Sequence, residues 1–239
     1  MNITSLMDDC KIRAPAGVAR CRFTLAVFVL GVTILTASHA QTLTTLANFG
    51  GPSTNLAGFY PDAALIQGPD GTLYGTTFNG QFPAAGTVFK MQPDGSGFSV
   101  LKFFTNWLEG KFVFDHLTLS SNVLYGTADT GGDSDLGTIF RLGTDGSGFQ
   151  VLKSFGTNDG ANPNGGLVLF DNVLYGAAVN YPGASGAVFR MNTDGTDYTL
   201  LKVLAPSDGT APVGGLTLSD GVLYGTTQAR RRFRLRNRV

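Results

Sequence analysis

The sequence has few of the residues on which crosslinked and metal-bound sites depend. Only two cysteines occur among the 239 residues, Cys10 and Cys21, and both precede residue 40. Beyond residue 40 the chain contains no thiol and a single histidine, His116. These shortages exclude a disulfide framework and a cysteine nucleophile in that region, and they leave too few ligands for a zinc site. We therefore expect no metal and no cofactor.

Charged residues are also scarce, at 14% of the chain, and they are unevenly distributed. Residues 41–227 contain seven Lys or Arg and fifteen Asp or Glu, a net charge of −8. The last twelve residues add six arginines and residues 1–40 have a net charge of +2, so the formal charge of the whole chain is zero. Because a surface of net negative charge repels phosphate, we do not expect residues 41–227 to bind nucleic acid.

Residues 1–40 have the pattern of an export signal. A basic stretch that ends at Arg22 precedes the apolar run 23–36, and the small residues Ser38 and Ala40 fit a signal peptidase. We expect cleavage after Ala40 and a periplasmic, extracellular or cell-surface location. The apolar run is shorter than the ~20 residues that a membrane helix needs, so no membrane span is expected after signal cleavage.

The region beyond the signal contains an internal repeat, and its period is about fifty residues. The tripeptide Leu-Tyr-Gly begins at residues 73, 124, 174 and 223. A motif that begins with glycine and ends with phenylalanine covers residues 86–89, 137–140 and 186–189. A third marker, apolar and in most copies with Leu-Lys at its centre, covers residues 45–49, 100–104, 151–155 and 200–204. Three markers in a fixed order at one period indicate a tandem array.

Each repeat contains four short apolar or alternating runs with turn residues between them. In the third copy the runs are 166–170, 173–179, 186–191 and 198–203. Asp, Asn and Gly in the short connections tolerate the positive φ of tight hairpins. No segment beyond residue 40 has an apolar period of 3.6 residues, so we expect almost no helix.

This pattern predicts an all-β fold, a β-propeller-like array of about four blades, each a four-stranded antiparallel sheet. Stacking the blades buries the two faces that an isolated sheet would expose. The glycine pairs 165–166 and 214–215 open the innermost strand, where converging blades leave least room. A linear β-solenoid and a β-sandwich remain the alternatives, both less favoured.

The repeats also resemble a known bacterial family. The stretches LYGTT, GTVFK, DGSGF followed by VLKSF, and DGANPNGGL are similar to choice-of-anchor tandem repeats, also called GloVer repeats, across residues 44–227. The resemblance implies an exported, surface-associated protein with a kelch-like propeller fold, and it implies no particular ligand. It also implies an anchoring segment near the C-terminus, where this chain has only arginine-rich residues.

The arginine-rich segment 228–239 interrupts the repeat. Its Phe-Arg-Leu at 233–235 matches residues 140–142, but it follows the Leu-Tyr-Gly tyrosine by 9 residues, whereas the earlier copies have 15 and 14. We therefore expect the repeats to end at residue 227, and we favour a truncated or frame-shifted tail over a genuine strand. Residues 45–49 would complete the last blade if the ring closed. An arc or an imperfectly closed ring is the prediction.

Ligand binding is expected at the end of the blades that carries the long connections. Alternating strand direction puts the short hairpins at one end and the long, variable loops at the other, and such loops on a rigid scaffold commonly bind ligands. Tolerance of insertions explains their length equally well. The candidate ligand-binding residues are Trp107, Asp115, His116, Asp133, Asp135 and Tyr181.

Each candidate has a functional and a structural interpretation. Trp107 would stack on a sugar or anchor a partner, or it would cap the edge of the core. Asp115 and His116 replace the glycine pair of other copies, which puts His116 near the mouth of a central channel either as a titrating group or as a hydrogen-bonded structural residue. Asp133 and Asp135 share a loop with Asp129, but their spacing matches no calcium motif, which favours a solvated loop.

A noncatalytic binding or structural module is the first functional hypothesis, with a glycan or a cell-surface protein as its ligand. No Gly-x-Ser-x-Gly motif is present, and a catalytic triad would have to use His116. A carbohydrate-active enzyme with carboxylates such as Glu109 or Asp115 on the same face is the second hypothesis, although nothing in the sequence pairs them. An inert surface repeat is the third.

Overall fold

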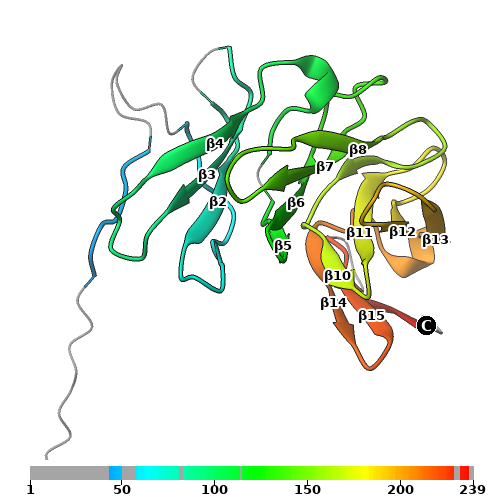
Figure 1. Ribbon diagram of the computed structural model, residues 1–239. Helices are drawn as coiled ribbons and strands as arrows, with labels where there is room; N and C mark the ends of the chain where they lie inside the picture. Colours follow the sequence, from blue (N-terminus) through cyan, green and yellow to red (C-terminus); the bar gives the residue numbers. More distant parts are fainter. Residues whose placement is uncertain (1–42, 50–57, 81–82, 114, 229–231, 237–239) are drawn as a thin grey trace, which may run out of the picture. The chain divides into compact units, whose positions relative to one another are not determined.

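Four antiparallel sheets follow one another along the chain (Figure 1). The structure is a computed structural model that describes residues 43–49, 58–80, 83–113, 115–228 and 232–236. All of these belong to one unit that begins at Leu43. The expected signal peptide, residues 1–40, lies outside the described residues.

Three sheets contain the four-stranded meander that the repeat predicts. The first has β1 (Ile66–Gln67), β2 (Leu73–Thr77), β3 (Thr87–Met91) and β4 (Ser99–Phe103). The second has β5 (Thr118–Ser120), β6 (Val123–Ala128), β7 (Thr138–Gly143) and β8 (Gln150–Ser154). The third has β10 (Val168–Phe170), β11 (Val173–Asn180), β12 (Ala187–Asn192) and β13 (Thr199–Val203), with β9 (Ala161–Pro163) added beside β11.

The fourth sheet contains β14 (Gly214–Ser219), β15 (Val222–Thr226) and β16 (Arg232–Arg236). The described residues include no α-helix, only the 3-10 turns η1 (Trp107–Glu109) and η2 (Pro206–Asp208). The prediction of an all-β, propeller-like array of four blades is thus confirmed. The third copy differs from expectation in the added strand β9 and at the ends of its strands, where the first strand begins at Val168 rather than at residue 166.

The spacing of the two main motifs has a direct steric cause. The glycine of Leu-Tyr-Gly pairs across the sheet with the phenylalanine of the second motif, as Gly75 with Phe89 and Gly126 with Phe140. A Cβ placed on Gly126 would lie 2.5 Å from Cζ of Phe140 and 3.0 Å from Cδ2 of Leu117. Only glycine therefore leaves room for the phenyl ring, and the same contact recurs in the third sheet.

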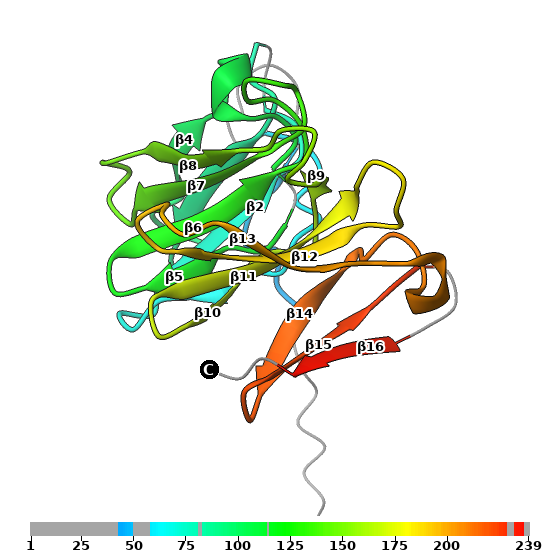
Figure 2. The ribbon, with the colours of Figure 1, turned by 90° about the vertical axis from the view of Figure 1, so that its right-hand side faces the viewer.

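Strand alternation lets each sheet contact both of its neighbours. Leu124 packs in a core cluster with Tyr74 of the first sheet, whereas the next residue, Tyr125, packs with Phe189 of the third sheet. Successive side chains of a strand point to opposite faces, so one tripeptide serves two interfaces. Figure 2 shows the sheets turned by 90°, so that the third and fourth sheets, on the right of Figure 1, face the viewer.

The tyrosines of the motif report how far this stacking extends. Tyr74, Tyr125 and Tyr175 are 4%, 6% and 2% exposed, but Tyr224 of the fourth sheet is 41% exposed. The three core clusters join the first sheet to the second, the second to the third and the third to the fourth. Within the described part of the chain, no cluster joins the fourth sheet to the first. An arc or an imperfectly closed ring stays the prediction.

Residues 43–49 lie against the first sheet without forming a strand. The ring centroids of Phe49 and Phe89 are 5.1 Å apart, close to the 5.0 Å between Phe104 and Phe140 at the next interface. Phe49 thus packs on the first sheet as Phe104, the residue after β4, packs on the second sheet. A pairing of residues 45–49 with the last blade does not occur among the described residues.

The expectation that the array ends at residue 227 is corrected by β16. Residues 232–236 pair with β15, and Gly225 lies opposite Phe233 in the same register as Gly126 opposite Phe140. The loop before β16 is shorter than its counterparts, but a hairpin loop of a few residues is sufficient to reverse the chain. The short loop before β16 led to the expectation that the repeats end at residue 227, but the register is set by the residues that pair and not by the length of the loop. A truncated or frame-shifted origin of the tail stays a prediction.

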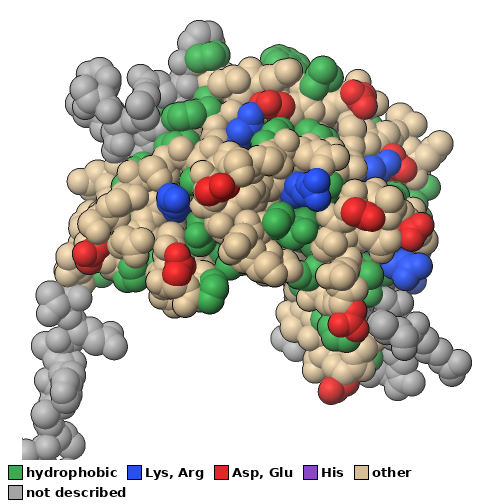
Figure 3. Space-filling view, in the orientation of Figure 1, with side chains coloured by type: hydrophobic (Ala, Val, Ile, Leu, Met, Phe, Trp, Pro, Cys, Tyr) green, Lys and Arg blue, Asp and Glu red, His purple; other side chains and the backbone are tan. Residues whose placement is uncertain are grey.

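The charged side chains visible in Figure 3 lie scattered over the face shown, with basic and acidic groups interspersed. They do not gather there into a patch of one sign.

Substitution of Gly126 by alanine tests the steric basis of the repeat. We expect Gly126→Ala to lower the free energy of unfolding by about 1–3 kcal/mol, because the added methyl group overlaps the ring of Phe140. Urea unfolding followed by circular dichroism measures the change. In a double-mutant cycle with Phe140→Leu, the cost of the alanine should fall because the ring is gone. Additive effects in that cycle would contradict the ring contact as the cause.

Candidate functional site

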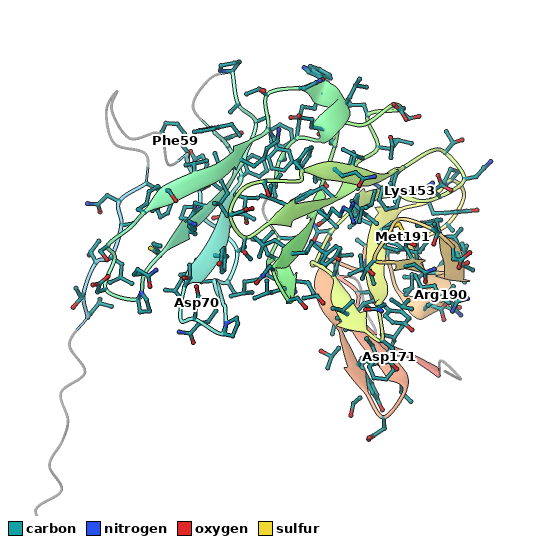
Figure 4. All side chains as sticks on the ribbon, in the orientation of Figure 1. Phe59, Asp70, Lys153, Asp171, Arg190 and Met191 are labelled. Carbon is teal, nitrogen blue, oxygen red and sulfur yellow. The ribbon has the colours of Figure 1, made fainter. Side chains whose placement is uncertain are left out.

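The two ends of the sheets carry different kinds of connection, as the sequence predicts. At one end the hairpins contact each other, and the N–H of Thr144 donates to the carbonyl of Asn122 over 2.9 Å. At the other end the long loops pair through isolated bridges such as Phe59 with Asn79 and Lys111 with Thr130. Figure 4 labels Phe59 and Asp70 at opposite ends of the first sheet. We call the second end the long-loop face; it comprises residues 58–60, 78–80, 83–86, 105–113, 129–137, 156–164, 180–186 and 205–213.

Backbone hydrogen bonds make this face rigid from sheet to sheet. The N–H groups of Phe112, Asn162 and Ala211 donate to the carbonyls of Ala85, Leu136 and Ser185, over 2.7, 2.9 and 2.9 Å. The three donor residues occupy equivalent positions, and all have positive φ, at 60°, 55° and 50°. Because the bond uses only main-chain groups, the side chains at these junctions are free to differ. No sequence signal marks them.

A lysine–carboxylate pair supports each loop that leads from one sheet to the next. The pairs are Lys102 with Glu109, Lys153 with Asp159 and Lys202 with Asp208, at 2.8, 2.6 and 3.0 Å. Sequence reasoning missed them, although a carboxylate six or seven residues after each lysine is visible in three copies. Glu109, a candidate carboxylate of the enzyme hypothesis, is therefore held by Lys102.

Trp107 and Asp135 are brought together by a residue that the sequence did not single out. The Nζ atom of Lys111 lies 3.4 Å from the centroid of a Trp107 ring and 3.2 Å from Oδ1 of Asp135. The Trp107 carbonyl accepts from the N–H of Gly132 over 2.8 Å, and its side chain is 64% exposed. Trp107 is thus fixed by its backbone and open to solvent, and it does not cap the core.

Asp133 and Asp135 take part in the hydrogen bonds that hold their loop. Oδ1 of Asp135 accepts from the N–H of Gly131 over 2.8 Å, and the N–H of Asp133 donates to Ser154 over 2.7 Å. Within the described ranges, no group of three or more His, Cys, Asp or Glu residues is arranged to hold a metal ion. The loop has the ordinary structure of hydrogen-bonded turns.

Asp115 lies near the innermost strands and is hydrogen-bonded to neighbouring sheets. Its Oδ1 accepts from the N–H of Gly165 over 2.8 Å, and its Oδ2 accepts from the Thr127 hydroxyl over 3.0 Å. Its backbone carbonyl accepts from the hydroxyl of Thr76 in the first sheet over 3.0 Å. Burial raises the pKa of the Asp115 carboxyl, although these side-chain hydrogen bonds oppose the change.

His116 lies beside Asp115 and packs on glycine. A Cβ on Gly166 would overlap the His116 ring, and a Cβ on Gly215 would lie 3.3 Å from its Cε1. The ring therefore fills space that the glycines of the third and fourth copies leave open. The glycine pairs and the pair Asp115–His116 are complementary parts of one packing arrangement, whereas the sequence related them only by their equivalent positions in the repeat.

Tyr181 borders a hollow of about 340 Å³ on the long-loop face. The hollow lies between the loops of the second and third sheets, and Leu136 and Pro182 also line it. The amide Nδ2 of Asn180 donates to Oδ1 of Asn162 over 2.8 Å. The two hollows at the hairpin end, of about 220 and 500 Å³, are lined by charged groups that include Lys90, Arg141 and Asp145.

Four stacked antiparallel sheets define the protein as β-propeller-like. The sequence model of the Gloeobacter/Verrucomicrobia repeat matches residues 30–234, and the chain belongs to this family. The family resemblance seen in the sequence is therefore confirmed. No curated protein matches the sequence.

Solved structures with similar folds include several of low sequence identity. A chain in the crystal structure of a nidogen/laminin complex is 18% identical, with a TM-score of 0.53 over 70% of this chain and 57% of that one. The computationally designed Ika4 protein is 15% identical, with a TM-score of 0.49 over 82% and 99%. A gluconolactonase from Xanthomonas campestris is 14% identical, with a TM-score of 0.43 over 68% and 55%. The chain spans 57% of the first of these, and that likeness supports the propeller fold alone.

Helices of sufficient length and apolarity to cross a membrane are absent from the part of the chain that the structure describes.

The raised pKa of Asp115 predicts a pH dependence of stability. Between the ordinary value of 3.8 and the raised value, the folded protein binds more protons than the unfolded chain. The free energy of unfolding contributed by this group therefore falls as pH rises through that window. We expect Asp115→Asn to gain stability relative to the parent protein as pH rises above the ordinary value of 3.8, measured by urea unfolding at each pH.

Asp194→Asn provides a control of opposite sign. Hydrogen bonds from Thr196 lower the pKa of the Asp194 carboxyl, so its stabilising contribution is lost as pH falls below the ordinary value. Asp194→Asn should therefore be less stable than the parent protein above pH 3.8, and this difference should shrink as pH falls. Parallel pH profiles for the parent and Asp115→Asn would contradict the burial of a titrating Asp115.

Proposed function

We propose that the protein is an exported, noncatalytic binding module whose long-loop face takes a glycan or a cell-surface protein. The main support for this function is the side chain of Trp107, which is exposed to solvent. An aromatic side chain whose backbone is already fixed contributes contact area to a complex at little cost in conformational entropy.

The fold does not require an aromatic residue at this position. The corresponding turn between the third and fourth sheets, η2, begins with Pro206, and its Asp208 pairs with Lys202 as Glu109 pairs with Lys102. Trp107 and Leu108 are 64% and 57% exposed, so they add little to the core. The turn can form without large apolar side chains, so contact with a partner best explains the exposed Trp107 and Leu108.

The positions of the carboxylates support a noncatalytic module. Glu109 is bound to Lys102, whereas Asp115 is bound to Gly165 and Thr127 of the innermost strands. Each has a structural partner of its own, and the structure records no contact between the two. The enzyme hypothesis gains no supporting observation from this arrangement.

Export is supported by the sequence of residues 1–40, with its basic, apolar and small-residue regions in the order of a signal peptide. The repeat-family resemblance points in the same direction. The net charge of −8 over residues 41–227 favours neutral or basic ligands over nucleic acid.

Tryptophan fluorescence tests the proposed face directly, because Trp107 is the only tryptophan in the chain. Purified protein would first be screened on a glycan array and against immobilised bacterial envelope proteins. A ligand found there should then shift or quench the Trp107 emission in titration. We expect Trp107→Ala to weaken binding about tenfold or more, as for a buried aromatic anchor, when calorimetry measures the affinity.

Phe170→Ala is the matched control, since Phe170 is an exposed aromatic residue in β10, next to the hairpin turn at the opposite end of the sheets. It should leave the affinity unchanged. Equal losses in the two variants, or the absence of any glycan or protein ligand while circular dichroism shows an intact fold, would refute the proposed function.

A further inference from the structure

The hollow beside Tyr181 has a size and a position suited to a small ligand. Its volume of about 340 Å³ is near the lower end of the range typical of ligand pockets. It is built on a rigid junction, because the N–H of Asn162 donates to the Leu136 carbonyl over 2.9 Å and Ala161 pairs with Asn180 in the β9–β11 ladder. The walls are therefore largely formed before a ligand arrives.

The wall of the hollow is apolar and aromatic. Leu136, Ala161 and Pro182 line it together with Tyr181, and no charged side chain is among its lining residues. A charged ligand would lose hydration here without gaining a partner of opposite charge, which disfavours it. A ligand with an apolar face and a polar edge fits better, and an aromatic ring offers a flat surface to such a face.

The polar groups at the rim are neutral and available. Asn180 and Asn162 orient each other, because Nδ2 of Asn180 donates to Asn162 and Nδ2 of Asn162 donates to the Asp129 carbonyl over 3.0 Å. Within the described residues, Oδ1 of Asn180 and the hydroxyls of Thr157 and Tyr181 have no hydrogen-bond partner. The rim thus offers an amide carbonyl and two hydroxyls, which both donate and accept.

This set of residues is specific to the third sheet. Asn180 pairs with Ala161 as Thr130 pairs with Lys111 and Asn79 with Phe59, so the next residue, Tyr181, corresponds to Gly131 and Gly80. At the second sheet, Gly131 packs closely against the carbonyl of Trp107. The fold forms the same junction with glycine, so the tyrosine is not needed to build it.

We infer that the hollow bordered by Tyr181, Asn180 and Thr157 is a subsite for one neutral pyranose ring of a glycan. The C–H face of the sugar lies on the Tyr181 ring, and its hydroxyls contact Asn180 and Thr157. This assignment rests on the proposed function and names the ligand class for one part of the long-loop face.

Chemical-shift titration of isotope-labelled protein with neutral methyl hexopyranosides tests the subsite. Tyr181→Ala should weaken the binding of the sugar that binds best by about fivefold or more, whereas Tyr181→Phe, which retains the ring, should lose less. Tyr60→Ala is the matched control, because Tyr60 is an exposed tyrosine on the same face and should not affect the sugar. Circular dichroism and the urea midpoint verify that each variant is folded.

Glucuronate tests the predicted neutrality, and it should bind more weakly than the matching neutral sugar. The inference is overturned if no neutral hexopyranoside binds, if glucuronate binds equally well, or if Tyr181→Ala has no more effect than Tyr60→Ala. A ligand that depends on Trp107 but not on Tyr181 would leave the proposed function intact and refute the sugar subsite. Loss of all binding to the long-loop face would refute both.

Discussion

A phenyl ring that lies on a glycine is the contact on which the architecture of this protein depends. Phe140 occupies the space above Gly126, and any side chain there would overlap the ring. The contact links two motifs that lie fourteen residues apart in the second copy, and it fixes the register of the central strand pair. The leucine and tyrosine just before the glycine then face opposite neighbours, so that the second sheet packs on both the first and the third. One steric requirement, repeated along the chain, thus produces both the sheet and the stack.

The long-loop face is independent of this requirement, and that independence is what permits a function there. Main-chain hydrogen bonds and lysine–carboxylate pairs hold the junctions, so the tips of the loops contribute little to the core. Trp107 at one junction and Tyr181 at another are therefore tolerated without being needed. Rigid main chain with variable side chains is the usual basis of a binding surface. The protein belongs to the Gloeobacter/Verrucomicrobia repeat family, and Trp107 and Tyr181 lie on the same end of its sheets.

The candidate residues divide according to how far their partners lie along the chain. Trp107 could be proposed from the sequence because it is the only tryptophan, and Tyr181 because it lies in a long loop. The role of Asp115 could not be found in this way, since its hydrogen-bond partners include Gly165, fifty residues away, and Thr76, thirty-nine residues away. Lys111 has no repeat counterpart that would mark it, yet it joins Trp107 to Asp135. A pattern in sequence reports local chemistry, whereas these roles arise from contacts between sheets.

The sequence by itself determined the number of blades, the order of strands within each and the end at which the long loops gather. It could do so because alternation, hairpin turns and the glycine–phenylalanine spacing are local properties that repeat. Only the tertiary structure decided that residues 232–236 complete a third strand in the fourth sheet, that Asp115 is a structural group and that a hollow opens beside Tyr181. Those outcomes depend on register across a shortened loop and on the packing of one sheet against the next. Neither is encoded in the spacing of residues within a single repeat.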